Sequence, residues 1–307
     1  MRIVLAGGSG FLGRHLARRC AGTGHDVIVL TRRREARLPF RQEVWDGRTV
    51  GSWAESLIGP GPVAVVNLAG KLVDCRPTAD NITALRRSRV DATRALVLAS
   101  QQLDRPVDRW LQSSTTAIWS DAGDVRLDES SPLPDPGLPQ MTGVAQAWED
   151  AIDGANTAAR TVLRTSIVLA NGCPAWDRLA LLARWGAGGT VGPGTQWFSW
   201  IHLDDWLRIA DAALGLDAQI TLPDGVVVAA DPAPVRNREL MALLRSAFHR
   251  PGLPTPSALV QLGAWALRTD PALALTGRHA TSTVLARAGF RFGHPDLATA
   301  IRQLAAG

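Results

Sequence analysis

A glycine-rich turn follows the first apolar segment of the chain. Residues 3–6 are apolar without alternation, as in a strand that is buried on both faces. Glycines then recur at every third position, and an apolar stripe with helical spacing begins directly after them. A dinucleotide site needs this order, because backbone amides and the positive end of a helix must reach a pyrophosphate. The residues expected to surround the pyrophosphate are Gly7, Gly10, Phe11, Leu12 and Gly13. The alternative is a purely structural turn in another α/β protein.

The end of the second apolar segment bears on the choice of cofactor. Residues 26–30 predict a second buried strand, and Thr31, Arg32 and Arg33 follow it. NAD-selective sites place a carboxylate here to bind the ribose 2′-hydroxyl, whereas guanidinium groups suit a 2′-phosphate. We therefore expect NADP(H). A solvated basic loop is the alternative.

Strand and helix patterns alternate up to about residue 170. Strands are expected over residues 3–6, 26–30, 44–46, 62–68, 110–114, 161–169 and 226–230, and helices over residues 11–22, 79–103 and 144–155. This alternation predicts an α/β fold with a parallel sheet and right-handed crossovers. Such sheets bind ligands at the carboxyl ends of their strands. The residues expected to contact the cofactor there are Asp46, Leu68, Ala69, Gly70, Ser113 and Thr165.

Composition excludes several classes of protein. The chain has 307 residues, 46% of them apolar and 20% charged, which is typical of a soluble globular protein of one or two domains. The net charge of +5 is spread over scattered arginines, so we expect no nucleic-acid partner. Three widely separated cysteines lack metal-binding spacing and resemble reduced cytoplasmic thiols, and no metal is expected. We expect neither a signal peptide nor a membrane span, and hence a cytoplasmic protein.

Several motifs together resemble one known family. They are Gly7-x-x-Gly10-x-x-Gly13, Asn67-Leu-Ala-Gly70, Ser113-Ser-Thr115, Leu163-Arg164, the segment 200–205 (WIHLDD) and the C-terminal segments 275–279 and 288–292. The chain resembles an atypical extended short-chain dehydrogenase/reductase, of the epimerase-like branch that ends in a small C-terminal module. This resemblance implies a doubly wound Rossmann domain over residues 1–170, joined by the late strand near 226–230. It also implies a smaller substrate-binding domain and C-terminal module over 171–307, with NADP(H) lying across the sheet.

The chain departs from this family at the catalytic residues. Enzymes of the superfamily generally use a Tyr with a Lys four residues later, and these positions fall on Met141 and Ala145. The chain contains no tyrosine, and its single lysine is Lys71. The resemblance aligns Thr115 with a hydroxyl that binds the substrate oxygen. A capping hydroxyl is the alternative.

Two residues after the fourth predicted strand are candidates for the missing proton donor. Lys71 and Asp74 follow that strand, beside the expected position of the nicotinamide ribose. An amine can shift its pKa on burial, whereas an arginine cannot. The alternatives are an exposed loop lysine and an ion pair between Asp74 and Arg76.

Large side chains are expected to border the substrate cleft. Trp119, Met141, Trp197 and Trp200 would favour a small apolar or aromatic carbonyl or enone substrate, and core packing is the alternative. These features predict an NADP(H)-dependent oxidoreductase with a non-standard mechanism. The alternatives are a redox-neutral isomerase or cyclase, and a non-catalytic NADP-binding sensor or assembly protein. The sequence allows a homodimer but does not specify one.

Overall fold

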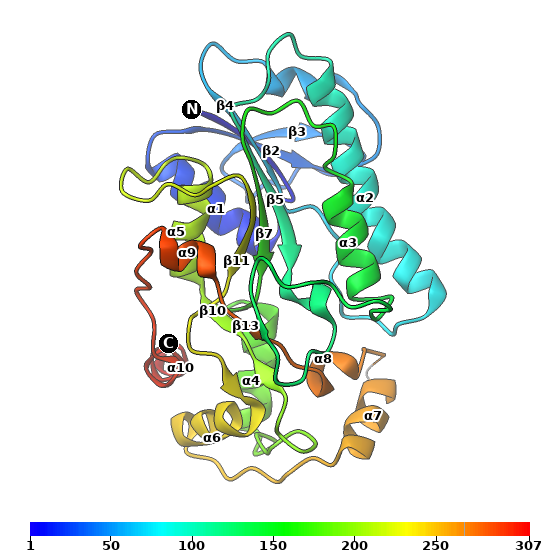
Figure 1. Ribbon diagram of the computed structural model, residues 1–307, viewed down its shortest axis with the longest axis vertical. Helices are drawn as coiled ribbons and strands as arrows, with labels where there is room; N and C mark the ends of the chain where they lie inside the picture. The colour runs from blue at the N-terminus through cyan, green and yellow to red at the C-terminus, as the bar shows by residue number, and fades with distance from the viewer. Residues whose placement is uncertain (267) are drawn as a thin grey trace.

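A computed structural model describes residues 1–266 and 268–307 (Figure 1). The described chain is built around a seven-stranded sheet in the order β3-β2-β1-β4-β5-β7-β11, in which all neighbouring strands are parallel. These strands are β1 (Arg2–Ala6), β2 (Asp26–Thr31), β3 (Arg41–Val44), β4 (Val63–Asn67), β5 (Arg109–Thr115), β7 (Arg160–Thr165) and β11 (Gly225–Ala229). The prediction of an α/β fold with a Rossmann-type, doubly wound parallel sheet is confirmed.

Helices cover both faces of this sheet, which explains the unbroken apolar runs of its strands. Helices α1 (Phe11–Gly22) and α5 (Leu203–Ala213) lie on one face, and α2 (Ala79–Gln101) and α3 (Thr142–Asp150) lie on the other (Figure 1). Ile3 and Leu5 of β1 share a core with α1 and α5, whereas Val4 and Ala6 share a second core with α2. Alternate residues of one strand are thus buried against different helices.

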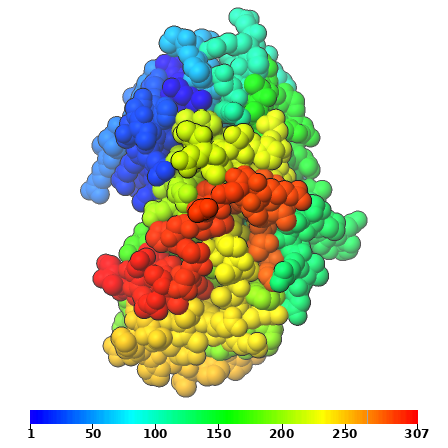
Figure 2. Space-filling model, turned by 60° about the vertical axis from the view of Figure 1, so that its left-hand side comes forward, coloured from blue at the N-terminus to red at the C-terminus, as the bar shows by residue number. Residues whose placement is uncertain are grey.

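A second group of elements lies beyond the carboxyl ends of the strands. Its helices are α4 (Pro174–Arg184), α6 (Asn237–Phe248), α7 (Ser257–Ala266), α8 (Ala272–Leu275) and α10 (Leu297–Ala306), whereas α9 (Thr283–Arg287) contacts the edge strand β11. Helix α6 packs against α4 and α10. Figure 2 shows the C-terminal residues, in red, on the surface beside the gold α6.

Short strand pairs and two 3-10 turns complete the fold. Two of the pairs are parallel: β6 (Arg126–Leu127) with β13 (His279–Ala280), and β8 (Ile167–Leu169) with β10 (Trp200–His202). The pair of β9 (Trp197–Phe198) and β12 (Val235–Arg236) is antiparallel. The 3-10 turns are η1 (Ser52–Leu57) and η2 (Thr116–Trp119). The β6–β13 pair brings the C-terminal module back to the segment that follows η2.

Most predicted elements match the structure to within two residues at each end, and three differ by more than that. The strand expected over 161–169 is divided at Ser166, whose N–H and hydroxyl both donate to the Ala229 carbonyl, at 3.0 and 2.8 Å. The chain then leaves the large sheet and pairs with β10. The strand expected over 44–46 is β3, which ends at Val44, and the helix expected over 144–155 is the earlier and shorter α3.

Within the described ranges, no helix combines the length and the apolar character that a membrane span requires.

Candidate cofactor and substrate site

The order of the central strands reverses between β1 and β4, and the loops after these strands touch. The Leu68 N–H donates to the Ala6 carbonyl at 2.9 Å. Gly7 has a φ of +82°, and a Cβ there would lie 2.7 Å from the carbonyl carbon of Leu68. A Cβ on Gly13 would lie 2.4 Å from the Gly7 carbonyl oxygen. Both glycines are therefore required by close packing, at the position where open α/β sheets bind their ligands.

Gly10 differs from these two glycines. Its φ of −74° and ψ of 172° are open to any L-residue, and a Cβ would approach only the Gly7 carbonyl oxygen, at 3.3 Å. Gly10 is the N-cap of α1 and supplies no side chain to the free N–H groups of the first turn. The half-buried Phe11 and Leu12 follow, and the Phe11 ring lies 4.7 Å from the ring of His15. The residues here fit a pyrophosphate, because the helix terminus is open and a side chain at Gly10 would fill the approach to it.

The basic loop after β2 has the properties expected of a 2′-phosphate site. Thr31 is buried, and its hydroxyl donates to the Arg33 carbonyl at 2.7 Å, which fixes the turn. Arg32 and Arg33 are exposed, and no described residue forms a hydrogen bond or ion pair with either guanidinium. Two guanidinium groups that have no partner among the described residues therefore lie where β2 ends.

Asn67 organises the small residues after β4. Its buried carboxamide donates to Thr93 Oγ1 at 2.8 Å and to Gln112 Oε1 at 3.0 Å, and accepts the Ala69 N–H at 3.1 Å. Leu68 and Ala69 are half-buried and Gly70 is exposed. Asn67 was part of the sequence motif. Its hydrogen bonds to Thr93 and Gln112 could not be predicted, because these residues lie on elements that are distant in sequence.

Other predicted cofactor residues are partly engaged already. Asp46 is exposed and accepts the N–H groups of Arg48 and Thr49 at 2.8 Å, and these hydrogen bonds lower the pKa of its carboxyl. Ser113 lies at the end of β5 and is 9% exposed. The Thr165 hydroxyl accepts the indole N–H of Trp206 at 3.0 Å.

The three residues predicted to act on the substrate differ in their surroundings. Thr115 ends β5 at the carboxyl edge of the sheet, half-buried, and its Oγ1 accepts the Ala117 N–H at 3.1 Å as the cap of η2. Lys71 is exposed. Asp74 forms an ion pair with Arg178 of α4 at 3.6 Å, and not with Arg76, the alternative considered from the sequence.

Arg76 instead joins this loop to α7. Its Nη2 donates to the Trp265 carbonyl, and its guanidinium lies 5.3 Å from the centre of the Trp265 ring. The loop that carries Lys71 and Asp74 therefore bridges the sheet to both α4 and α7.

Positions 141 and 145 are closed to solvent. Met141 is 4% exposed at the N-cap of α3, and Ala145 is 2% exposed one turn later. The Met141 sulfur accepts a hydrogen bond from Nη2 of Arg278 at 2.8 Å. Sequence reasoning included Arg278 in the motif segment 275–279 but assigned it no role, because only the fold brings residue 278 to residue 141.

Two tryptophans that we expected on the wall of the cleft lie in the interior. Trp119 is 1% exposed, with the Arg164 guanidinium 5.0 Å from the centre of its ring. Trp200 is completely buried, and its indole N–H donates to the Ala233 carbonyl at 3.2 Å. Core packing, the alternative considered from the sequence, describes both of these side chains.

Trp197 is half-buried and also has partners. The His279 ring stacks on it at 4.0 Å, Arg236 lies 4.0 Å from its centre, and its N–H donates to Asp124 at 3.1 Å. The expectation of an aromatic-lined cleft therefore has no support in the positions of these three tryptophans.

One group of side chains among the described residues has the composition of a metal site. His202, Asp204 and His294 bring three potential ligand atoms within 4.8 Å of one another. The two imidazoles are stacked at 3.7 Å with an interplanar angle of 27°. Because a metal must lie in the plane of each ring that binds it, nearly parallel rings cannot share one ion at bonding distance. Burial and the neighbouring His294 lower the pKa of His202.

Comparison with known proteins identifies the family. Residues 3–139 match the NAD dependent epimerase/dehydratase family, and residues 255–304 match a domain of unknown function, DUF1731. An epimerase family protein of Mycobacterium tuberculosis (strain CDC 1551 / Oshkosh) is 31% identical, over 97% of this chain and 96% of the relative. The chain belongs to the NAD-dependent epimerase/dehydratase family. Epimerase family protein SDR39U1 of Bos taurus, another relative, is 29% identical over the full length of both chains.

A solved relative in the epimerase/dehydratase family shares the whole fold. The crystal structure of human epimerase family protein SDR39U1 (isoform 2) with NADPH superposes with a TM-score of 0.85, at 27% identity and over 100% of both chains. The resemblance to an atypical extended short-chain dehydrogenase/reductase is thus confirmed.

Proposed function

We propose that this chain is an NADP(H)-dependent oxidoreductase that acts on a small carbonyl or enone substrate. The observation that carries the proposal is the open N-terminus of α1 at Gly10, on the same edge of the sheet as the unpaired Arg32 and Arg33. The α1 terminus would hold the pyrophosphate, and the two guanidinium groups would hold the 2′-phosphate. The human relative in complex with NADPH supports this choice of cofactor.

Thr115 would orient the substrate in this proposal. Parallel strands place their carboxyl ends at one edge, so the end of β5 lies on the same edge as the turns after β1 and β4. Bound NADPH supplies a hydride. The Thr115 hydroxyl can donate to the substrate oxygen while still accepting the Ala117 N–H, because a hydroxyl does both.

The proton must come from a group other than a phenol, since the chain has no tyrosine. Lys71 and Asp74 remain the candidates, because both lie on the loop after β4. Asp74 already pairs with Arg178 at 3.6 Å, with both side chains largely exposed, so this contact restrains the carboxylate only weakly.

Consumption of the cofactor tests the proposal. Purified protein is incubated with NADPH and a panel of small aldehydes, ketones and enones, and nicotinamide absorbance is followed. We expect oxidation of NADPH for at least one compound. Thr115→Val should slow it by about 10² to 10³ without weakening NADPH binding. Lys71→Met or Asp74→Asn should slow it by about 10² to 10⁴. Full turnover in all three variants would refute the assigned roles.

A second candidate function is non-catalytic NADP(H) binding, as in a sensor or an assembly protein. The capping role of Thr115 and the Asp74–Arg178 pair favour it, because both predicted groups have structural partners. Tight NADPH binding without turnover of any compound in the panel would select this candidate. The same assay therefore separates the two functions.

A further inference from the structure

The large sheet contains a buried arginine, Arg164, and the C-terminal module contains a half-buried one, Arg278. Arg164 is 6% exposed, and the Glu149 carboxylate receives both its Nε and its Nη2, at 2.9 and 2.8 Å. Arg278 has no such partner, because among the described residues no carboxylate forms an ion pair with it. Partial withdrawal of a cation from water without an anion is costly, and Arg278 is half-buried.

The contacts of Arg278 leave most of its donors free. Its Nη2 donates to Met141 Sδ at 2.8 Å and to Thr276 Oγ1 at 3.0 Å. A thioether is a weak acceptor, so the first contact compensates little of the lost hydration. Nε is buried and has no partner, and Nη1 has no acceptor among the described residues. Three of the five N–H groups are thus unpaired, and a ligand can reach only the two on Nη1, because Nε is enclosed by the protein.

Arg278 remains charged in this environment. Burial lowers the pKa of its guanidinium to about 10, and the nearby Asp121 carboxylate opposes this effect. Asp121 accepts the Gly277 N–H at 3.1 Å instead of binding the guanidinium. At neutral pH the site therefore has an unneutralised positive charge.

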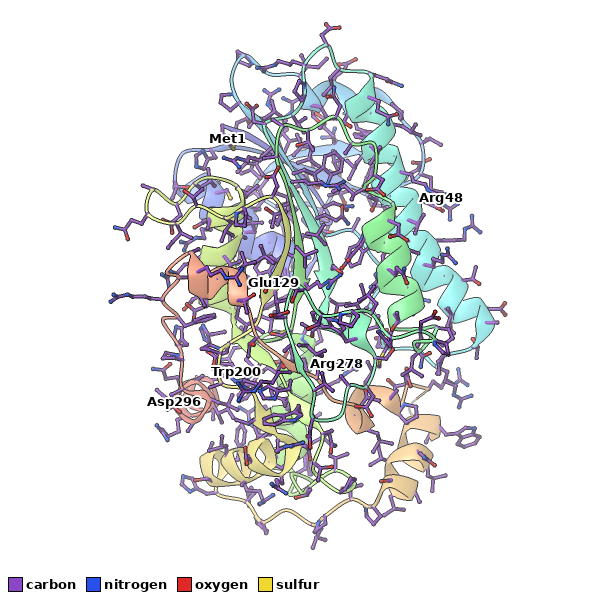
Figure 3. All side chains as sticks on the ribbon, in the orientation of Figure 1. Met1, Arg48, Glu129, Trp200, Arg278 and Asp296 are labelled. Carbon is purple, nitrogen blue, oxygen red and sulfur yellow. The ribbon has the colours of Figure 1, made fainter. Side chains whose placement is uncertain are left out.

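The position of Arg278 connects it to the predicted reaction site. Figure 3 shows Arg278 between the large sheet and α8. Met141, which it contacts, precedes Thr142, and the Thr142 hydroxyl donates to the Ile118 carbonyl of η2 at 2.7 Å. The turn η2 begins directly after Thr115. Short contacts thus join Arg278 to the turn that Thr115 caps.

We propose that Arg278 binds the carboxylate of a small substrate through the unpaired Nη1 of its guanidinium. This inference rests on the proposed function, because that function places the substrate beside Thr115. A carboxylate can accept a charge-assisted hydrogen bond from Nη1 and neutralises one positive charge. A phosphate dianion would leave excess negative charge beside Asp121. The substrate class is therefore a small carbonyl or enone compound with a carboxylate.

Binding of a charged probe and of its neutral counterpart tests this inference without turnover. The probes are crotonate and crotonamide, which have nearly the same shape but differ in charge. The chain has three methionines, so ¹³C-methyl NMR resolves Met141 once Met141→Leu assigns its signal. With excess NADP⁺, crotonate should shift the Met141 signal at a concentration at least about tenfold below that needed for crotonamide. Equal affinities in the unmodified protein would overturn the proposal.

Variants locate the charge that gives this preference. Arg278→Gln should remove the preference for crotonate, and Arg278→Lys should retain it in weakened form. Arg126→Gln is the matched control, because it removes one exposed charge from β6, the strand that pairs with β13 just after Arg278. It should leave the preference unchanged. A preference that persists in Arg278→Gln, or that Arg126→Gln removes equally, would overturn the assignment.

Inorganic phosphate distinguishes the two oxyanion classes. It should bind at least about tenfold more weakly than crotonate, and equal or tighter binding would overturn the choice of a carboxylate. None of these measurements uses NADPH oxidation. A protein that is inactive in the turnover assay can therefore still confirm the carboxylate site, and an active one can still fail this test.

Discussion

The Glu149 carboxylate of α3 and the Arg164 guanidinium of β7 form a two-point ion pair inside the protein, with N···O distances of 2.9 and 2.8 Å. The Ser114 hydroxyl of β5 also donates to this carboxylate, at 2.5 Å. One acidic side chain therefore fixes α3 to two strands of the sheet. Helix α3 includes Ala145, and Met141 is its N-cap, so this carboxylate also holds the helix that carries the two positions.

Glu149→Gln should destabilise the fold strongly. It leaves the Arg164 guanidinium buried without a counter-charge, which typically costs about 3–5 kcal/mol. Urea unfolding measures the loss. Glu43→Gln is the control, because Glu43 pairs with a largely exposed Arg41, and such pairs contribute about 0–1 kcal/mol. Similar losses in both variants would show that the buried pair has no special role.

Arg32→Ala combined with Arg33→Ala should remove a preference for NADPH over NADH. Neither guanidinium has a partner among the residues that the structure describes, and a hydrogen bond to a phosphate contributes about 1.5–3 kcal/mol. Calorimetric titration of both cofactors gives the ratio of their dissociation constants. Arg86→Ala with Arg94→Ala removes the same charge from exposed positions of α2 and should keep the preference. Equal affinities in the unmodified protein would contradict the prediction.

Two glycines of the turn should respond differently to substitution. Gly10→Val should abolish NADPH binding while the protein still unfolds cooperatively, because the backbone at Gly10 accepts any residue and its Cβ meets only the Gly7 carbonyl oxygen at 3.3 Å. Gly13→Ala should lower the melting temperature, because its Cβ would lie 2.4 Å from that same oxygen. Melting curves measure the stability of both variants, and calorimetric titration measures their affinity for NADPH. Retained NADPH affinity in Gly10→Val would mean that the turn is structural.

The features that the sequence predicted well are local ones. The strand–turn–helix at residues 3–22 has a short apolar run, glycines and a helical stripe in direct succession, so each part is specified within a few residues. The division of the strand over 161–169 was missed because it depends on the Ala229 carbonyl, which is distant in sequence. Nothing in the residues around Ser166 indicates that contact.

Contacts between residues that are distant in sequence also limited the prediction of the candidate site. Asp74 pairs with Arg178 rather than with Arg76, two residues away, because the fold brings α4 to the loop after β4. Trp119 and Trp200 lie next to polar segments in the sequence, and only the packing of the sheet against the second group of elements encloses them. Positions at strand ends could be predicted, whereas the partners of individual side chains could not.

Asp231 should make stability depend on pH. Burial, followed by repulsion from Asp205 and Asp296, raises the pKa of its carboxyl from 3.8 to about 7. The folded state therefore holds a proton that the unfolded state releases between about pH 4 and pH 7. The stabilisation is complete below about pH 4 and is lost as the pH rises through 7, by at most about 1.4 kcal/mol per pH unit.

Asp231→Asn should remove this loss, because an amide does not ionise and can still accept the Ala233 N–H that Oδ1 accepts at 2.9 Å. The stability of the variant relative to the unmodified protein should rise from pH 4 to pH 7 and then level off, as measured by urea unfolding. Asp224→Asn, at an exposed position near the start of β11, should show no such trend. A constant difference for Asp231→Asn would contradict the assignment.

Met141→Tyr combined with Ala145→Lys should destabilise the protein without raising its rate of NADPH oxidation. Both positions are almost completely buried, and Ala145 shares a core with Trp119, Ile118 and Leu127. A lysine there would bury its ammonium group among apolar side chains, and a tyrosine would overfill the space of Met141 beside Arg278. Met141→Leu, which conserves volume, should cost less than about 1.5 kcal/mol and serves as the control for this site. Melting temperature and NADPH oxidation are measured on the same samples. A double variant that melts like the unmodified protein and oxidises NADPH at least about tenfold faster would show that this site still accommodates the proton relay of its family.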